Sequence, residues 1–177
     1  ALQADVLAAV SGPRLIALDT MNLWIESTRD DLVALLPRVD VLMVNDSEAR
    51  LLSGQRSLAA AADAIRSLGP SRVVIKKGEH GALLFGRDSV LAVPAMILPE
   101  VVDPTGAGDS FAGGFMASLA RSGADRDAPD SLFRRAMLDG TVAASFVPEG
   151  FSVEGLLGRD DAEAAARLAT LQAMMVP

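Results

Sequence analysis

One aspartate, Asp109, stands where a glycine-rich turn leads into a helix, and the chain is best equipped for chemistry there. Gly106 and Gly108 allow positive φ angles and the close approach of a ligand to the backbone. The free N–H groups around Gly106, Ala107 and Gly108 would point at one spot with the helix dipole behind them, which forms an anion site. Because Asp109 would repel that anion, we expect it to take the proton of a hydroxyl that attacks phosphorus. The alternative is that Asp109 only favours the helix dipole.

The residues around this aspartate predict the loop and the helix that position it. Pro104 excludes regular structure on its N–H side and holds the preceding residue extended. Phe111, Phe115 and Leu119 recur every four residues and give a helix one apolar stripe. We therefore expect a helix over residues 107–121.

The first half of the chain alternates short apolar runs with helical patterns. The predicted strands cover residues 15–18, 39–44 and 73–75, and the predicted helices cover residues 2–10, 30–36, 46–52 and 57–68. This alternation is typical of a parallel sheet that buries its strands between two layers of helices. Ligands bind at the carboxyl ends of the strands in such sheets. Asp19, Asn45 and Lys77, which follow the three strands, are therefore expected to share one edge. Thr28 would cap the second of these helices and Pro37 would stop it.

The pattern changes after the third strand. Residues 82–85 and 90–93 are predicted to pair as an antiparallel hairpin. Two further helices are predicted over residues 130–146 and 160–174, the last capped by Asp160 or Asp161. The expected fold class is a three-layer α/β sheet, mostly parallel, with helices on both faces and the hairpin toward one edge.

Length and composition limit the kinds of partner that this chain suits. With 177 residues, half of them hydrophobic, it can form one domain or slightly more around a sizeable core. The net charge of −7 argues against non-specific nucleic-acid binding, and no apolar run approaches the roughly 20 residues of a membrane span. Cysteine is absent, which excludes disulfides and fits a reducing compartment. The first five residues lack signal-peptide features, so we expect a cytoplasmic location.

The run from Asp103 to Phe111, Asp-Pro-Thr-Gly-Ala-Gly-Asp-Ser-Phe, resembles the C-terminal signature of ribokinase-like (PfkB-type) carbohydrate kinases. The resemblance implies a ribokinase-like fold and the ATP-dependent phosphorylation of a hydroxyl on a sugar or related small molecule. It implies Asp109 as the catalytic base and Gly106–Gly108 as the anion hole, with ATP and Mg²⁺ as cofactors. A nucleoside kinase of the same family and an inactive nucleotide-binding or interaction fragment are the alternatives.

Two further stretches match positions of that family. Asn45 and Glu48 match an Asn-x-x-Glu whose Glu supports the Mg²⁺ and phosphate network, although the same spacing is close to a capping box. Gly78 and Gly81 match a Gly-x-x-Gly turn that lines the nucleotide, and Lys77 could offset triphosphate charge. For the two glycines, the alternative is an ordinary turn.

The resemblance assigns the remaining candidate residues less directly. Asp19 and Asn22 lie where some members reach the substrate or its phosphate, and a turn with an Asx cap is the alternative. Asp103 and Thr105 match positions that contribute to a monovalent cation site, which K⁺ would occupy. Ser145 lies where the family closes over adenine, and it departs from the Asn that many members have there.

The resemblance covers only the C-terminal part of the family. Its N-terminal signature, most of its sugar-binding residues and the lid that excludes water are not found in residues 1–177. We therefore expect this chain to be the nucleotide-binding portion, as a fragment that could pair with the missing half or form a homo-oligomer. Alone, the predicted strand 15–18 would expose an apolar edge.

Overall fold

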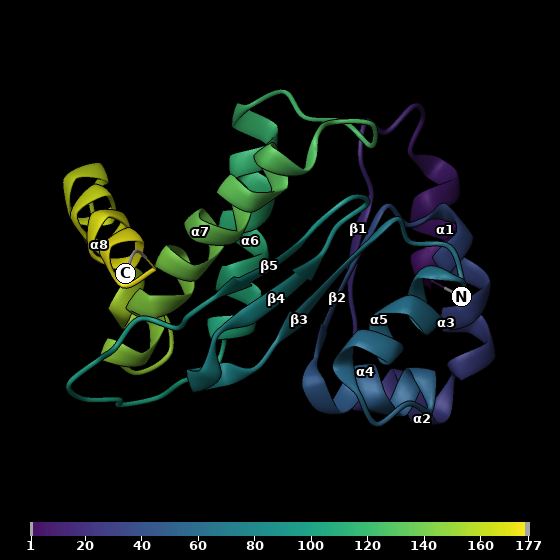
Figure 1. Cartoon of the computed structure of the whole chain (residues 1–177), viewed down its shortest axis with the longest axis horizontal. Coiled ribbons are helices and arrows are strands. Elements are labelled where there is room, and N and C mark those ends of the chain that lie inside the picture. The colour runs from purple at the N-terminus through teal and green to yellow at the C-terminus, as the bar shows by residue number, and fades with distance from the viewer. Residues whose placement is uncertain (1, 176–177) are drawn as a thin grey trace.

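Five strands form the middle layer of a three-layer fold (Figure 1). The computed structural model describes residues 2–175. In their order across the sheet, the strands are β1 (Ala17–Asp19), β2 (Val41–Asn45), β3 (Arg72–Lys76), β4 (Ala82–Phe85) and β5 (Val90–Val93). β1, β2 and β3 run parallel, whereas β4 pairs antiparallel with both β3 and β5. The predicted parallel strands and the predicted hairpin at the opposite edge are both confirmed.

Two sets of helices cover the two faces of the sheet (Figure 1). On one face lie α2 (Asn22–Ser27), α3 (Arg29–Leu35), α4 (Asp46–Ser53) and α5 (Leu58–Arg66); on the other lie α6 (Ala107–Arg121) and α7 (Asp130–Phe146), with α8 (Asp161–Ala173) against α7. Because successive strand residues point to opposite faces, Leu42 and Val44 join the first core and Val41 and Met43 join the second. Short 3₁₀ turns occupy Leu36–Arg38, Gly78–His80, Val147–Glu149 and Glu154–Leu156.

The strand register brings three polar residues to one edge of the sheet. Asn45 pairs with Lys76, and Asp19 pairs with Met43, so β1, β2 and β3 all end at this edge. Asp19, Asn45 and the start of the Lys77 turn therefore lie together, as predicted. The predicted apolar stripe of α6 is also confirmed, because its two phenylalanines and Leu119 are buried against the sheet.

The N-terminal part of the chain is less buried than the rest of the fold, and the prediction of a buried strand there is wrong in its burial. The helix α1 (Leu2–Ala9) forms, but none of its residues is buried and Leu2 is 77% exposed. The strand predicted at residues 15–18 begins instead at Ala17 and is only partly buried. Its position explains this, because β1 is the edge strand and has a neighbour on one side only among the described strands.

Helix α2 and the ends of α3 also differ from the prediction. The sequence predicts no helix over residues 22–27, and Ile25 is the only residue of α2 that is buried. Thr28 occupies the N-cap position of α3, but its hydroxyl donates to the carbonyl of Trp24 at 3.2 Å instead of accepting from the helix. Pro37 lies within the 3₁₀ turn that follows α3. A single buried side chain over six residues gives no helical repeat of apolar positions, so the sequence pattern does not identify α2 as a helix.

Glycines let α6 and α7 approach each other closely. A Cβ atom built on Gly114 would lie 2.7 Å from the Cβ of Ala143, and one on Gly140 would lie 2.8 Å from the carbonyl oxygen of Phe111. Real side chains do not tolerate such distances, so the two helix backbones meet where only glycine fits. This contact explains why Gly140 sits in the middle of α7 despite the poor helix propensity of glycine.

Adjacent glycines of α6 should respond in opposite directions to the same substitution. Gly114→Ala is expected to destabilise the fold by about 1–3 kcal/mol because the added methyl group overpacks the contact with α7. Gly113→Ala is the matched control, because its Cβ would meet nothing within 4 Å. It should stabilise the protein by up to about 1 kcal/mol through helix propensity. Urea unfolding of both variants measures the difference, and equal effects would show that the α6–α7 contact is loose.

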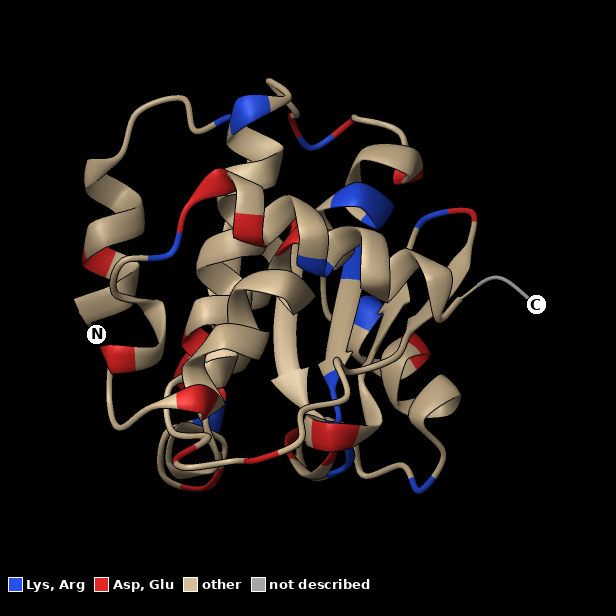
Figure 2. Cartoon of the chain, turned by 90° about the vertical axis from the view of Figure 1, so that its left-hand side faces the viewer, with Lys and Arg blue, Asp and Glu red and all other residues tan. Residues whose placement is uncertain are grey.

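No helix within residues 2–175 has the length and apolar character needed to cross a membrane. Acidic and basic residues are interspersed over the face of the molecule that Figure 2 presents.

Candidate active site

Asn45 and Glu48 form a complete capping box at the start of α4. The Asn45 side-chain oxygen accepts from the Glu48 N–H at 2.8 Å, and the Glu48 carboxylate accepts from the Asn45 N–H at 2.7 Å. Burial raises the pKa of the Glu48 carboxyl above its usual 4.5, against the opposing hydrogen bond from Asn45 and the positive charge of Lys76. The structural role that the spacing suggested is therefore present, and it holds a buried carboxylate at the carboxyl edge of the sheet.

Lys76 and Asp19 form an ion pair beside this capping box. The Lys76 ammonium lies 2.5 Å from Asp19 Oδ2, and the two side chains are 18% and 28% exposed. The other Asp19 oxygen accepts from the Thr20 N–H at 2.9 Å, but this bond to the next residue is not the Asx cap of the alternative, because Met21 is the N-cap residue of α2. Lys76 was not predicted as a site residue. The alternation of side chains along β3 could have identified Lys76. Val74 faces α6, and the residue two positions later in a strand faces the same side.

The turn before α6 presents two amides at the edge of the cleft described below. Gly106 is the N-cap residue, with φ of 87°, a left-handed conformation that suits glycine. Ala107 donates its N–H to the carbonyl of Pro104 at 3.1 Å, so this amide of the predicted anion hole is occupied. Within the part of the chain that the structure describes, the N–H groups of Gly108 and Asp109 have no acceptor. Of the three amides predicted for the anion hole, only that of Ala107 is therefore occupied within the described residues, and the Asp109 N–H is unpaired beside those of Gly106 and Gly108.

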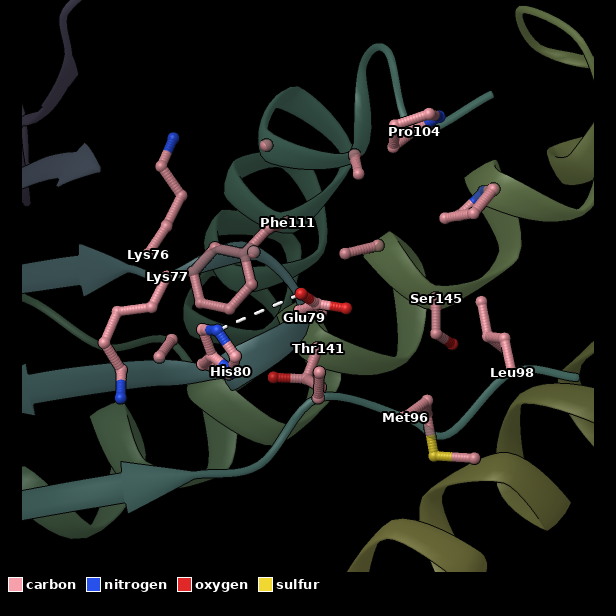
Figure 3. A pocket seen from close by; sticks show the side chains of 18 of the residues that line it. Lys76, Lys77, Glu79, His80, Met96, Leu98, Pro104, Phe111, Thr141 and Ser145 are labelled. Carbon is pink, nitrogen blue, oxygen red and sulfur yellow. Dashed lines mark ion pairs between the residues drawn. The ribbon is translucent and has the colours of Figure 1, made fainter. Parts of the chain in front are cut away.

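A cleft of about 780 Å³ runs along this edge between the Gly78–His80 turn, the start of α6 and the end of α7 (Figure 3). Lys76 lies at one end, and Met96, Leu98 and Ser145 lie at the other. The predicted residues that line it are Lys77, Gly78, Gly81, Ala107, Gly108 and Ser145. The cleft therefore has a cationic end beside α6 and an apolar end beside α7.

The other predicted site residues lie outside the lining of the cleft. They are Asp19, Asn22, Asn45, Glu48, Asp103, Thr105, Gly106 and Asp109. Asp109 is exposed on the first turn of α6, directly after the lining residue Gly108. Asn22 is exposed at the first position of α2. The Asp109 carboxylate is therefore open to solvent next to the cleft, as a base for a second substrate must be.

The Ser145 hydroxyl at the apolar end already has partners. It donates to the carbonyl of Val142 at 2.7 Å and accepts from Arg167 at 3.2 Å. Arg167 also donates to Glu149 at 2.7 Å and stacks 3.9 Å from the centre of the Phe146 ring. Because the Ser145 hydroxyl already donates its hydrogen to the Val142 carbonyl, it has no free hydrogen to donate to a ligand. Its side chain therefore contributes to the shape of the cleft.

Asp103 and Thr105 join two loops near the start of α6. The Thr105 side chain and its backbone N–H both donate to the Asp103 carboxylate, as does the backbone of Ser152, and these hydrogen bonds lower the pKa of Asp103 below its usual 3.8. Ser152 has φ of 58°, and the N–H of Val102 donates to the carbonyl of Pro148 at 2.7 Å. The loop before α6 is thus tied to the segment that follows α7, with a charged carboxylate at the junction.

The sequence that forms this site matches a known protein family. Residues 4–147 match the profile of the pfkB family of carbohydrate kinases. The chain belongs to this family. Its signature residues, from the loop at Asp103 to Asp109, form the start of α6 at the mouth of the cleft. Within residues 2–175, no three His, Asp or Glu side chains gather into a group that could hold a metal ion by themselves.

Curated proteins with similar sequences are named as kinases of different acceptors. A cytidine kinase of Thermococcus kodakarensis is 41% identical over 95 residues, which are 52% of this chain and 34% of that protein. A 2-dehydro-3-deoxygluconokinase of Thermoproteus tenax is 39% identical over 112 residues, which are 63% of this chain and 31% of that protein. The chain spans about a third of the length of these relatives.

Solved structures of the family share the fold. A ribokinase from Thermotoga maritima superposes with a TM-score of 0.73 at 23% identity, over 94% of this chain and 52% of that one. The aminoimidazole riboside kinase from Salmonella enterica, complexed with aminoimidazole riboside and an ATP analog, gives 0.72 at 24% identity, over 87% and 52%. The ribokinase-like fold is therefore confirmed, and the chain spans about half of these structures.

Proposed function

We propose that this chain supplies the nucleotide-binding and catalytic portion of a kinase that transfers phosphate from ATP to a hydroxyl of a sugar or related small molecule. The observation that carries the proposal is the cleft, which runs from a lysine and two amides without acceptors at the start of α6 to an apolar end beside α7. Its volume of about 780 Å³ falls in the usual range of small-molecule sites.

The polarity of the cleft fits ATP in one orientation. The apolar end, lined by Met96, Leu98 and Ser145, suits a nucleobase. The opposite end, with Gly108 and the dipole of α6, suits the phosphates. Gly78 and Gly81 carry the wall between the two ends, and a Cβ atom on Gly81 would lie only 2.1 Å from the carbonyl oxygen of Val93. That turn can therefore be made by glycine alone.

Asp109 is the base in this proposal. The acceptor hydroxyl oxygen forms a bond to the terminal phosphorus of ATP while the bond from that phosphorus to the bridging oxygen of ADP breaks. The hydroxyl proton passes to the Asp109 carboxylate. The amides of Gly108 and Asp109 stabilise the negative charge that grows on the transferring phosphoryl group.

The family also implies Mg²⁺ and a monovalent cation. Mg²⁺ is commonly held by one or two carboxylates and the substrate phosphates, with several waters kept. Glu48 fits such a role because its carboxylate lies at the carboxyl edge with the other site residues. When bound, Mg²⁺ would neutralise phosphate charge. Asp103, held ionised by its hydrogen bonds, and Thr105 are the residues that would support K⁺.

Two other candidate functions have observations in their favour. The identity to a cytidine kinase and to nucleoside kinases supports a nucleoside as the acceptor. In the described sheet, β1 is an edge strand that pairs on one side only, and apolar residues of α1 are exposed. Both observations support a nucleotide-binding portion that is inactive until it pairs with a further segment or another copy. The first alternative changes the acceptor, and the second makes this chain alone too incomplete for catalysis. Both use the same nucleotide cleft.

A pair of assays tests the proposal. The 177-residue chain is titrated with ATP and Mg²⁺ by calorimetry, and phosphate transfer from labelled ATP to a panel of sugars and nucleosides is measured with this chain and with the full-length gene product. We expect weak ATP binding and little transfer by the chain, and transfer to one class of acceptor by the full-length product. Absence of binding at millimolar ATP would refute the proposal, and efficient transfer by the chain alone would refute the inactive alternative.

Glu48→Gln separates the structural role of this residue from its metal role. The amide oxygen can still accept from the Asn45 N–H, so the cap of α4 should persist. The Mg²⁺-dependent part of ATP affinity or activity should fall about 10- to 100-fold, as is typical for residues that support a bound metal. ATP titrations with Mg²⁺ and with EDTA measure this part. An equal loss in EDTA would contradict a metal role.

Glu48 also gives the wild-type protein a defined pH dependence of stability. Burial raises the folded pKa of Glu48 above its usual 4.5, so the folded state binds this proton more tightly than the unfolded state does. The resulting stability is fully present below pH 4.5 and is lost as the pH rises through the folded pKa. Glu48→Gln should remove this pH-dependent part, and melting curves between pH 4 and pH 8 would reveal it.

A further inference from the structure

Lys76 has an unusual electrostatic position. Its ammonium lies 3.3 Å from where a Cβ atom of Gly108 would be, so it sits directly against the first turn of α6. The start of a helix carries about half a unit of positive charge, and cations are disfavoured there. A lysine in this place raises the energy of the empty protein unless an anion lies between the ammonium and the helix.

Asp19 is the only residue of the described chain that forms an ion pair with this ammonium. The carboxylate reaches Lys76 from the end of β1, two strands away in the sheet, and the first turn of α6 lies against the same ammonium. Glu48 lies close enough for both charges to act on it, since Lys76 lowers its pKa and Asp19 raises it. The cluster therefore contains one cation with a single direct counter-ion, at the cationic end of a cleft that is open to solvent.

The two neighbouring lysines are not equivalent. The side chains of Lys76 and Lys77 point in opposite directions in Figure 3, as successive residues at a strand end must. Lys76 points toward the first turn of α6, whereas Lys77 forms no hydrogen bond or ion pair with α6 within residues 2–175. The lysine that the sequence pattern selected is thus not the one that reaches the amides of the anion site.

We infer that Lys76 binds the terminal phosphates of the nucleotide and that Asp19 is the counter-ion that holds this lysine in place before the nucleotide arrives. This inference rests on the proposed function, because it names the phosphate-binding cation of the same cleft. When ATP binds, the ammonium exchanges its contact with the carboxylate for a contact with phosphate oxygens. No covalent bond changes in this step. The amides of Gly108 and Asp109 and the Lys76 ammonium then surround the phosphates from different elements.

A comparison of two lysine variants tests the inference. Lys76→Met and Lys77→Met are titrated with ATP and, separately, with adenosine, which occupies the base end and carries no phosphate. A hydrogen bond to a charged group contributes about 1.5–3 kcal/mol, so Lys76→Met should lose about 10- to 100-fold in ATP affinity. Its adenosine affinity should match that of the wild type, which shows that the cleft is still folded. Lys77→Met should lose ATP affinity about threefold or less.

Two further variants sharpen the comparison. Arg134→Met removes one positive charge from an exposed position of α7 outside the cleft lining, and it controls for the change in net charge. Asp19→Asn removes the competing carboxylate, so ATP affinity should rise a few-fold while adenosine affinity stays constant. A tenfold loss of ATP affinity in Asp19→Asn would overturn the counter-ion role.

The possible failures are distinguishable. Wild-type protein that binds ATP while Lys76→Met binds it equally well would overturn this inference and leave the proposed function standing. The inference would also be overturned if Lys77→Met lost more ATP affinity than Lys76→Met, or if Lys76→Met lost adenosine and ATP affinity in equal measure. Wild-type protein that binds neither ligand would overturn the proposed function and this inference with it.

Discussion

Asp109→Asn is expected to lower kcat of the full-length gene product by about 10²–10⁴-fold while ATP affinity stays within a few-fold of the wild type. Asn is nearly isosteric with Asp, so the first turn of α6 and the amides of Gly108 and Asp109 should persist. The variant loses only the ability to accept the proton of the attacking hydroxyl. Because Asp109 is exposed and outside the lining of the cleft, its removal should leave the nucleotide contacts in place.

A purely structural role for Asp109 predicts a different outcome. An acidic residue in the first turn of a helix contributes up to about 1 kcal/mol through the helix dipole, so the variant would melt slightly lower and turn over normally. Measuring kcat, ATP affinity and melting temperature on the same preparation separates the two roles. A lower melting temperature with an unchanged kcat would mean that another group is the base.

Asp130→Ala is expected to destabilise the fold by about 3–5 kcal/mol, the usual cost of leaving a buried charge without its partner. Asp130 accepts from the Arg72 side chain at 3.1 Å, and Arg72 is 1% exposed beneath the Phe133 ring. The same carboxylate accepts from the Asp88 N–H at 3.1 Å and the Ser89 hydroxyl at 2.8 Å. It therefore ties the β4–β5 turn and the buried arginine to the start of α7.

The double variant Arg72→Met and Asp130→Ala controls for the buried charge. It should be more stable than Asp130→Ala alone, because no unpaired guanidinium remains in the core. Urea unfolding of the single and double variants measures the coupling between the two residues. If the double variant were less stable by the sum of the two single losses, the pair would not be acting as a unit.

Asp130 should also contribute to the acid sensitivity of the protein. Burial alone would raise the pKa of this carboxyl, but the hydrogen bonds from Asp88, Ser89 and Arg72 outweigh it and lower the pKa below its usual 3.8. A depressed folded pKa contributes stability that is present above pH 3.8 and is lost as the pH falls through the folded value.

Much of the fold could be predicted because local patterns and tertiary packing agree. The apolar run at Val41–Val44 and the four-residue stripe of α6 both match the burial that the structure shows. The patterns failed where burial was weak. At α1 they predicted a helix without showing that it lies on the surface, and at α2 they predicted no helix, because Leu2 and Trp24 are apolar and still exposed.

The candidate site was predictable to the extent that single residues have local signatures. The Asn45–Glu48 spacing predicted a capping box, and that box is present. The ion pair between Asp19 and Lys76 joins residues 57 positions apart, so its existence depends on strand order and register. The Ala107 amide was expected to be free, and its bond to Pro104 depends on the conformation of the turn, which composition does not specify.

A crystal structure of this chain with a non-hydrolysable ATP analogue and Mg²⁺ is the most direct test of the nucleotide site. The adenine of the analogue is expected beside Leu98 and Ser145. Its terminal phosphates are expected within hydrogen-bond distance of the Lys76 ammonium and the amides of Gly108 and Asp109. An analogue bound outside the cleft, or bound with its phosphates at the Ser145 end, would contradict the proposed site.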